Sequence, residues 1–239
     1  MTPEPSERPV ALITGASAGL GLALAHGLAE RGWALVIDAR GAEALKDAAD
    51  ALAARTDVVP LAGDVADPEH RADLLDAITE LGRLDLLVNN ASYLGPSPLQ
   101  ALAAADLDEL RRVYEVDVLA PLALTQLMLP ALTAASGALI NISSDAAVEP
   151  YETWGGYGSA KAALDHATKV LAAENPALAV YAVDPGDLRT AMHQAAFPGE
   201  DISDRPEPAA VVPSFLQLLD KRPASGRYRA AEFAPAVTS

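Results

Sequence analysis

The order of apolar segments is the feature of this sequence that most constrains its fold. From Val10 onward, short apolar runs alternate with longer stretches of helical spacing. Buried parallel strands read as continuous apolar runs, and each needs a crossover to the next, usually a helix. We therefore predict an α/β fold with a doubly wound parallel sheet. The predicted strands are Val10–Thr14, Ala34–Ala39, Val58–Gly63, Leu84–Asn89, Gly137–Ser143, Ala179–Val183 and a seventh near Arg227–Ala231. The predicted helices are Leu20–Arg31, Ala42–Thr56, Pro68–Leu81, Ala101–Leu129 and Gly156–Glu174.

The chain is expected to form one domain. Its 239 residues, 51% of them hydrophobic, suit a single core, and no Gly/Ser linker divides residues 10–239. Residues 1–9 are polar with three prolines and lack the apolar core of a secretory signal, so we expect a disordered arm and a cytoplasmic protein. Residues 185–208 are dense in Pro, Gly and Asp, which predicts a short lid over the substrate.

Charge and composition argue against several classes of partner. The net charge of −16 disfavours nucleic acid and anionic membrane surfaces. The most apolar stretch, 116–132, contains two prolines, an aspartate and a glutamine, which makes it a poor membrane span. With no cysteine and four scattered histidines, no metal site is expected.

A glycine-rich turn follows the first predicted strand. Residues 14–21 read Thr-Gly-Ala-Ser-Ala-Gly-Leu-Gly and lead directly into a predicted helix. Glycines permit close backbone approach to a pyrophosphate, and the N–H groups of the helix N-terminus favour an anion. The turn is therefore interpreted as a phosphate-binding site, although an ordinary strand-to-helix turn would also use these residues. The residues assigned to the cofactor here are Gly15, Ser17, Gly19, Leu20 and Gly21.

Three side chains are candidates for proton transfer to a carbonyl oxygen. Tyr157 and Lys161 are four positions apart, which places both on one face of a helix. A phenol of pKa about 10 needs a nearby cation to exchange protons readily, and Lys161 supplies that charge. Ser144, at the end of a predicted strand, can donate a hydrogen bond to the same oxygen. A solvated Tyr/Lys surface pair would have the same spacing.

Taken in order, these motifs resemble those of the short-chain dehydrogenase/reductase family, which has a Rossmann-like fold. Residues 14–21 resemble its Thr-Gly-x3-Gly-x-Gly turn, and residues 89–91 resemble its Asn-Asn-Ala-Gly element, with Ser92 in place of the last glycine. The resemblance implies hydride transfer between a nicotinamide cofactor and a small carbonyl or alcohol substrate. It makes Tyr157 the acid/base, and Ser144, thirteen positions earlier, the donor to the substrate oxygen. Lys161 then binds the nicotinamide ribose and modulates Tyr157. The other cofactor contacts that it implies are Asp64, Val65, Asn90, Ala91, Pro185, Gly186 and Thr190.

One catalytic position departs from the family pattern. Asp117 stands where the family has an asparagine that holds a water in the proton path to the lysine. An aspartate could keep that water while adding negative charge, or it could be a buried acid with a structural role. The departures at Asp117 and Ser92 leave open an alternative function, that of a non-catalytic regulator that binds the dinucleotide.

The substrate region is expected between the catalytic serine and tyrosine. Tyr151 and Trp154 lie there in the sequence, and His193 lies in the predicted lid, so each is a candidate substrate contact. Packing of aromatic side chains under a loop would explain the same pattern. The resemblance also implies a homo-oligomer formed through the helices of residues 101–129 and 156–174.

The preferred cofactor depends on the end of the second strand. NAD-binding proteins of this architecture place a carboxylate there, against the ribose hydroxyls. The resemblance aligns Ala39 with that position and Arg40 with the site that meets a 2′-phosphate. Strand alternation sends Asp38 to the opposite side from Ala39. We therefore expect NADP(H), with NAD(H) possible if the register shifts by one residue or if Arg40 is only a solvated loop residue.

Overall fold

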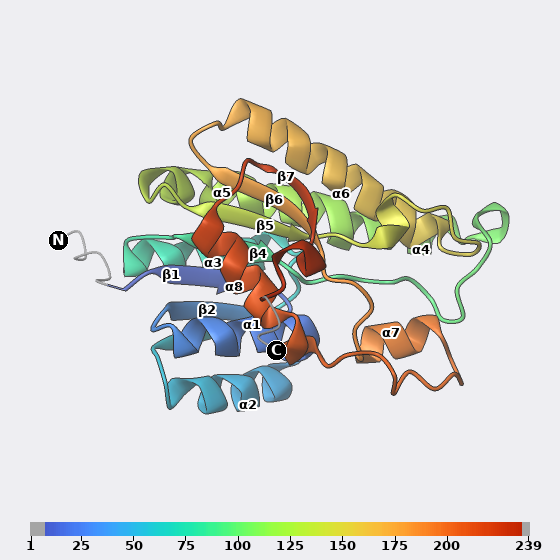
Figure 1. The fold of residues 1–239 in the computed structure, drawn as a ribbon, viewed down its shortest axis with the longest axis horizontal. Helices are drawn as coiled ribbons and strands as arrows, with labels where there is room; N and C mark the ends of the chain where they lie inside the picture. Colours follow the sequence, from blue (N-terminus) through green and yellow to red (C-terminus); the bar gives the residue numbers. More distant parts are fainter. Residues whose placement is uncertain (1–7, 236–239) are drawn as a thin grey trace.

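The computed structural model describes residues 8–235, and its centre is a seven-stranded parallel sheet with helices on both faces (Figure 1). The strand order is β3-β2-β1-β4-β5-β6-β7, with every adjacent pair parallel. The strands are β1 (Val10–Ile13), β2 (Ala34–Ala39), β3 (Val58–Ala62), β4 (Leu86–Asn89), β5 (Ala138–Ile142), β6 (Ala179–Asp184) and β7 (Gly226–Arg229). The predicted doubly wound α/β fold is confirmed.

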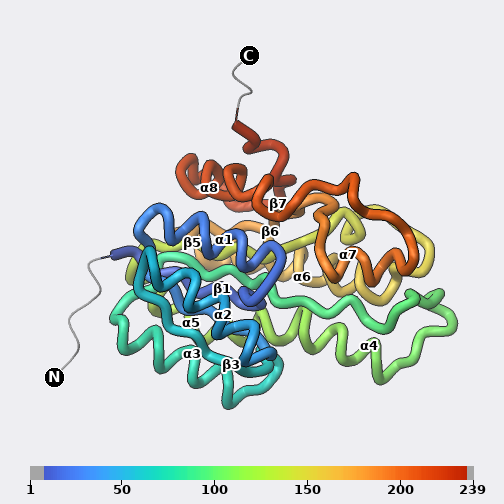
Figure 2. Tube along the Cα trace, turned by 90° about the horizontal axis from the view of Figure 1, so that it is seen from below, coloured from blue at the N-terminus to red at the C-terminus, as the bar shows by residue number. Residues whose placement is uncertain are grey.

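Two apolar cores lie on the two faces of this sheet. On one face pack α1 (Gly19–Glu30), α2 (Ala42–Ala53) and α8 (Val212–Lys221). On the other pack α3 (Pro68–Leu81), α5 (Ala120–Ala134) and α6 (Gly155–Glu174). Figure 2 shows α1 and α8 on the opposite side of the sheet from α3 and α5. Strands β1, β2, β4 and β5 are buried throughout, as continuous apolar runs require.

The strand order reverses between β1 and β4. The chain moves outward from β1 to β3 on one side, then returns to place β4 beside β1 on the other. Loops leaving the carboxyl ends of β1 and β4 therefore diverge and leave a crevice, which is where ligands bind in open α/β sheets.

The predicted helix Ala101–Leu129 is broken into shorter pieces. A 3₁₀ turn (Leu102–Ala104) precedes α4 (Leu107–Tyr114), and Asp106 caps α4 by accepting a hydrogen bond from Asp108 N at 2.8 Å. A π-helical turn (Glu115–Leu119) then joins α4 to α5. By length and composition alone, Leu107–Ala134 could cross a membrane. Its buried side chains on α5, however, pack against the sheet as part of the protein core.

The C-terminal part contains two helices that the sequence interpretation did not include. Helix α7 (Ala191–Ala196) lies within the predicted lid, near the carboxyl ends of the strands, and α8 covers α1 (Figure 1). Most of the predicted N-terminal arm, residues 1–7, lies outside the described residues. Pro9 already belongs to the sheet region, because its carbonyl accepts a hydrogen bond from Ala34 N at 2.9 Å.

Candidate active site

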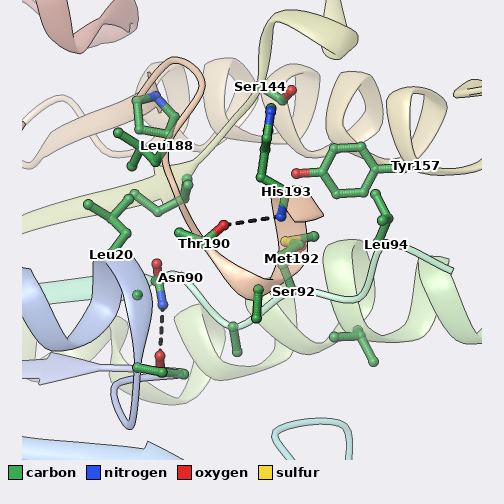
Figure 3. Close-up of a pocket in the computed structure, with 18 of the residues that line it drawn as sticks. Leu20, Asn90, Ser92, Leu94, Ser144, Tyr157, Leu188, Thr190, Met192 and His193 are labelled. Carbon is green, nitrogen blue, oxygen red and sulfur yellow. Dashed lines mark hydrogen bonds between the residues drawn. The ribbon is translucent and has the colours of Figure 1, made fainter. Parts of the chain in front are cut away.

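A cavity of about 470 Å³ opens at the carboxyl edge of the sheet and brings together segments that are far apart in the sequence (Figure 3). Most of the predicted site residues line it: Gly15, Ser17, Gly19, Leu20, Arg40, Asp64, Val65, Asn90, Ala91, Ser144, Trp154, Tyr157, Lys161, Pro185, Gly186 and Thr190. Gly21, Asp117 and Tyr151 lie outside this lining.

The glycine turn is fastened to the end of β4. Thr14 Oγ1 accepts hydrogen bonds from Asn90 N at 3.0 Å and Ala91 N at 2.9 Å. In return, Asn90 Nδ2 donates to Thr14 O at 2.8 Å and to Gly15 O at 3.1 Å. These bonds hold the turn and the β4 loop at a fixed separation across the crevice.

The geometry of this turn requires glycine and leaves room for an anion. Gly15 and Gly19 have φ of 65° and 56°, a region that disfavours side chains. A Cβ on Gly21 would lie 2.5 Å from Gly15 O, so the turn could not close against α1. The N-cap of α1, Ala18, has no side chain that could accept the first N–H groups of the helix. Residues 18–20 line the cavity, and the free N–H groups of a helix N-terminus suit the pyrophosphate of a dinucleotide.

At the end of β2, the carboxylate of Asp38 is turned into the protein. Its Oδ1 accepts a hydrogen bond from Gly15 N at 2.8 Å, and its Oδ2 lies 3.0 Å from Nε2 of the buried His70. Both carboxylate oxygens are therefore already bonded within the protein. Arg40, two residues later, is exposed at the cavity and forms no ion pair with any other residue of the described chain. The side chain available to a 2′-phosphate is thus a cation.

The loop after β3 forms the next wall of the cavity. Val65 is buried there, and its carbonyl accepts a hydrogen bond from Arg71 Nη1 at 2.7 Å. Asp64 Oδ1 accepts from Ala66 N at 3.0 Å, and its Oδ2 lies 3.5 Å from Arg112 on α4. This segment is therefore held rigidly where a flat adenine ring could lie against it.

Tyr157 and Lys161 lie one turn apart on α6 and are both buried. Lys161 Nζ is 5.5 Å from the centre of the Tyr157 ring and donates a hydrogen bond to Ile142 O at 3.1 Å. Burial raises the pKa of Tyr157, and the charge of Lys161 opposes that rise. Burial alone lowers the pKa of Lys161, but Asp117 and Tyr157 together raise it above its usual value. Lys161 therefore stays charged beside the phenol.

Asp117 lies in the π-helical turn and is fully buried. Its Oδ1 is 3.5 Å from Lys161 Nζ and accepts hydrogen bonds from Ser92 Oγ at 2.5 Å and Tyr93 N at 3.2 Å. Burial raises the pKa of this carboxyl, while Lys161 and Ser92 oppose the rise. The two residues that depart from the family pattern, Asp117 and Ser92, are therefore in direct contact.

Ser144 follows β5 and faces the cavity. Its Oγ accepts from Ala146 N at 3.1 Å and donates to Asp145 Oδ1 at 3.1 Å. Its carbonyl oxygen accepts a hydrogen bond from Arg227 Nη2 on β7 at 2.9 Å. Arg227 also binds Asp165 on α6, Nε to Oδ2, at 2.8 Å. One guanidinium therefore ties Ser144 to the helix that carries Tyr157 and Lys161.

Aromatic side chains extend from Tyr157 towards the lid. The ring of Trp154 lies 5.9 Å from the rings of both Tyr157 and Phe197, and Phe197 lies 4.9 Å from His193. His193 and Trp154 line the cavity, and Figure 3 shows His193 on the side towards which the Tyr157 hydroxyl points. Tyr151 is 47% exposed, and its hydroxyl donates to Asp145 Oδ2 at 2.9 Å. Trp154 therefore lies where it could contact a substrate, as predicted. Tyr151 lies outside the cavity, next to Trp154.

Sequence reasoning missed several residues of this region. Neither the role of His70 beside Asp38 nor that of Arg227 behind Ser144 has a local motif that could have revealed it. The Ser92–Asp117 contact had a signal, because both positions depart from one family pattern. Within residues 8–235, no group of three or more His, Cys, Asp or Glu is placed to hold a metal ion.

The chain is similar in sequence and in fold to known oxidoreductases. The family model described as short chain dehydrogenase matches residues 9–201. Sepiapterin reductase of Mus musculus is 36% identical over 201 residues, covering 78% of this chain and 77% of the relative. A short-chain dehydrogenase of Escherichia coli, solved with NADPH, has a TM-score of 0.85 and 30% identity, covering 96% of this chain and 99% of the other. An alcohol dehydrogenase of Thermococcus sibiricus, solved with 5-hydroxy-NADP, has a TM-score of 0.84 and 27% identity, covering 93% and 96%.

Proposed function

This chain belongs to the short-chain dehydrogenase family, and we propose that it is an NADP(H)-dependent oxidoreductase that interconverts a carbonyl compound and its alcohol. One observation carries the proposal. Tyr157, Lys161 and Ser144 line the same cavity as the glycine turn, so a dinucleotide on the turn and a carbonyl at Tyr157 would share one enclosed space.

The three side chains have complementary tasks during reduction. A nicotinamide dinucleotide bound along the cavity supplies the hydride. Tyr157 donates its phenolic proton to the carbonyl oxygen as negative charge develops there. Ser144 Oγ donates a hydrogen bond to the same oxygen, and Lys161 stabilises the resulting phenolate through its fixed positive charge. In oxidation, the phenolate takes the proton from the alcohol.

The preference for NADP(H) is supported by the end of β2. Asp38 is engaged with Gly15 and His70, so it is not free to accept hydrogen bonds from a ribose. Arg40 forms no ion pair within residues 8–235, and a guanidinium binds phosphate through strong charge-assisted bonds. The solved relatives bound to NADPH and 5-hydroxy-NADP agree with this direction.

The cavity wall favours a substrate with an apolar or aromatic group next to its carbonyl. Leu94, Trp154 and Met192 contribute the apolar lining near Tyr157. Aromatic rings pack well in offset or edge-to-face contact with an indole such as Trp154. Aryl ketones and aldehydes should therefore be better substrates than small aliphatic ones.

Turnover measured across a panel of ketones, aldehydes and alcohols tests the function. Oxidation or reduction of the cofactor should be seen with at least one member, and Tyr157→Phe should lower its rate by about a hundredfold or more. An undiminished rate in Tyr157→Phe would reject the mechanism. Cofactor binding without turnover on any member would instead favour the alternative, a regulator that binds the dinucleotide without reaction. The observation that favours this alternative is the contact of Ser92 with Asp117, because it changes the charge and hydrogen bonding around Lys161.

A further inference from the structure

Ser92 and Asp117 form one buried unit behind the catalytic pair. Ser92 follows β4 by three residues, and Asp117 comes from the π-helical turn before α5. Widened π turns often occur at functional sites because they displace a side chain from the regular helical position. Here the turn carries Asp117 to the end of β4, where Ser92 Oγ donates to its Oδ1 at 2.5 Å.

The hydrogen bonds on Asp117 are unevenly shared between its two oxygens. Ser92 Oγ, Tyr93 N and Lys161 Nζ all approach Oδ1, at 2.5, 3.2 and 3.5 Å. Oδ2 is buried and has no hydrogen-bond partner among the described residues. Three donors on one oxygen, one of them a cation, favour the ionised carboxylate and concentrate its charge next to Lys161. Ser92 thus opposes the effect of burial, which raises the pKa of this carboxyl.

Lys161 is held between opposing influences. It is buried, and a buried ammonium ion is costly unless it is paired. The groups that act on it are Asp117, the Tyr157 hydroxyl, Asp165 on α6 and the carbonyl of Ile142. Asp117 therefore has two effects. It favours the charged form of Lys161, and it weakens the electrostatic effect of Lys161 on Tyr157.

The charged and polar groups that act on Tyr157 are Lys161, Asp117, Ser92 and Asp145. Lys161 and Ser92 favour the phenolate, whereas Asp117 and Asp145 favour the phenol. An asparagine in place of Asp117 would remove the carboxylate that forms an ion pair with Lys161. The neutral, proton-donating phenol is the form that carbonyl reduction needs, while alcohol oxidation needs the phenolate.

We propose that Ser92 and Asp117 are positioning residues: Ser92 fixes Asp117 beside Lys161, and Asp117 anchors Lys161 and opposes its pull on the Tyr157 proton, so that this site is set for carbonyl reduction. The inference rests on the proposed function, since Tyr157 must be the acid/base for its protonation to matter.

Phenolate formation by Tyr157 can be followed without any substrate. Ultraviolet absorbance is titrated against pH in the full-length protein and in Tyr157→Phe, and the difference isolates Tyr157 from the other tyrosines. Asp117→Asn should move the midpoint of that difference to lower pH by about one unit or more, as expected when a cation loses an opposing charge. The Tyr157→Phe reference is remade in the Asp117→Asn background. Glu149→Gln removes an exposed carboxylate and should leave the midpoint unchanged within a few tenths of a unit.

A double-mutant cycle tests whether the two residues act as one. With the best substrate of the panel, Ser92→Ala should lower kcat several-fold when Asp117 is present. In the Asp117→Asn background, its effect should fall below about twofold, because coupled residues are not additive. Ser92→Thr, which keeps the hydroxyl, should restore most of the loss. Thermal melting and NADPH binding of each variant separate these effects from misfolding.

The outcomes are distinct. An unmoved Tyr157 midpoint in a folded Asp117→Asn protein would overturn the inference, as would effects of Ser92→Ala that are equal in both backgrounds. Failure of the proposed function has a different signature, namely full activity in Tyr157→Phe or no turnover with any substrate. The absorbance titration still decides the inference in that second case.

Discussion

His70 Nε2 lies 3.0 Å from Asp38 Oδ2, while Asp38 Oδ1 accepts the hydrogen bond of Gly15 N at 2.8 Å. Two buried side chains from β2 and α3 thus hold the first glycine of the phosphate-binding turn. A Cβ on Gly63 would lie 2.2 Å from His70 Nδ1, so the imidazole fills the space beside that glycine. Asp38 and His70 therefore hold the phosphate-binding turn in position from the protein interior.

The first prediction concerns cofactor preference. Arg40→Ala should weaken NADPH binding by about ten- to a hundredfold, since a hydrogen bond to a charged group contributes about 1.5–3 kcal/mol. NADH binding should be nearly unchanged, because it has no 2′-phosphate. Dissociation constants measured at fixed ionic strength check both values. Arg55→Ala, an exposed arginine near the end of α2, serves as the control. Tighter binding of NADH by the natural protein would contradict the assignment.

The second prediction concerns the pH dependence of stability. The hydrogen bond to Asp38 is the largest influence on His70 and raises its pKa above the unfolded value, in spite of burial. A raised pKa means that the protonated histidine stabilises the folded state, fully below the unfolded pKa of about 6.5. That contribution is lost as pH rises through the folded pKa. His70→Gln should therefore lower the free energy of unfolding more at pH 5.5 than at pH 9.

The measurement is urea unfolding of the natural protein and of His70→Gln at pH 5.5 and pH 9. At pH 5.5 the loss should be of the order of 1–3 kcal/mol, as for a buried hydrogen bond between charged groups. His26→Gln on α1 provides the control, since the histidine that bonds to Asp38 is His70 on α3. An equal loss at both pH values would show that His70 acts by packing alone.

The third prediction concerns Arg227, which binds Asp165 and the carbonyl of Ser144 and lies 3.5 Å from Asp184. Arg227→Leu leaves the buried Asp165 without its guanidinium partner and removes the nearer of the two arginines beside Asp184, so the protein should lose about 3–5 kcal/mol of stability. Arg227→Lys should recover only part of this stability, because an ammonium group lacks the planar guanidinium that bonds both Asp165 and the Ser144 carbonyl. Denaturant unfolding gives these values.

The neighbouring Arg229 supplies the comparison for that experiment. Its side chain is 59% exposed and 4.0 Å from Asp184, so Arg229→Ala should cost less than about 1 kcal/mol. Equal losses of unfolding free energy in Arg227→Leu and Arg229→Ala would contradict the prediction that the buried ion pair of Arg227 stabilises the fold. A fall in kcat with Arg227→Lys, at unchanged NADPH affinity, would trace its effect to Ser144.

The fourth prediction concerns assembly. Leu119, Leu127 and Val170 are 51%, 36% and 42% exposed on the helical layer that contains α5 and α6. Large apolar side chains that are exposed on such a layer favour association. We expect a homo-oligomer through this surface, with Leu119→Glu together with Leu127→Glu shifting the mass by light scattering to that of a monomer. Ala51→Glu, on the exposed side of α2, should leave the mass unchanged. A monomeric natural protein at micromolar concentration would contradict this.

Local patterns in the sequence were enough to define the sheet and the main motifs. The alternation of apolar runs with helical spacing predicted β1, β2, β4 and β5 most directly, because burial on both faces of a parallel strand leaves a continuous apolar run. The strands at the two edges of the sheet, β3 and β7, are less buried and leave a weaker pattern. The glycine turn was predictable for a similar reason, since positive φ at Gly15 and Gly19 demands a residue without a side chain. The pair Tyr157 and Lys161 was visible because helical spacing links residues four apart.

Only the tertiary structure decided how these motifs are supported. Arg227 meets Ser144 across 83 positions of sequence, and Asp38 meets His70 across 32, and no periodicity records such contacts. The π-helical turn that carries Asp117 to Ser92 is a local widening that a 3.6-residue period does not predict. Helical and strand periods report which face of an element is buried. Which buried polar group meets which depends on how distant elements pack, because each needs a partner that the fold alone brings near.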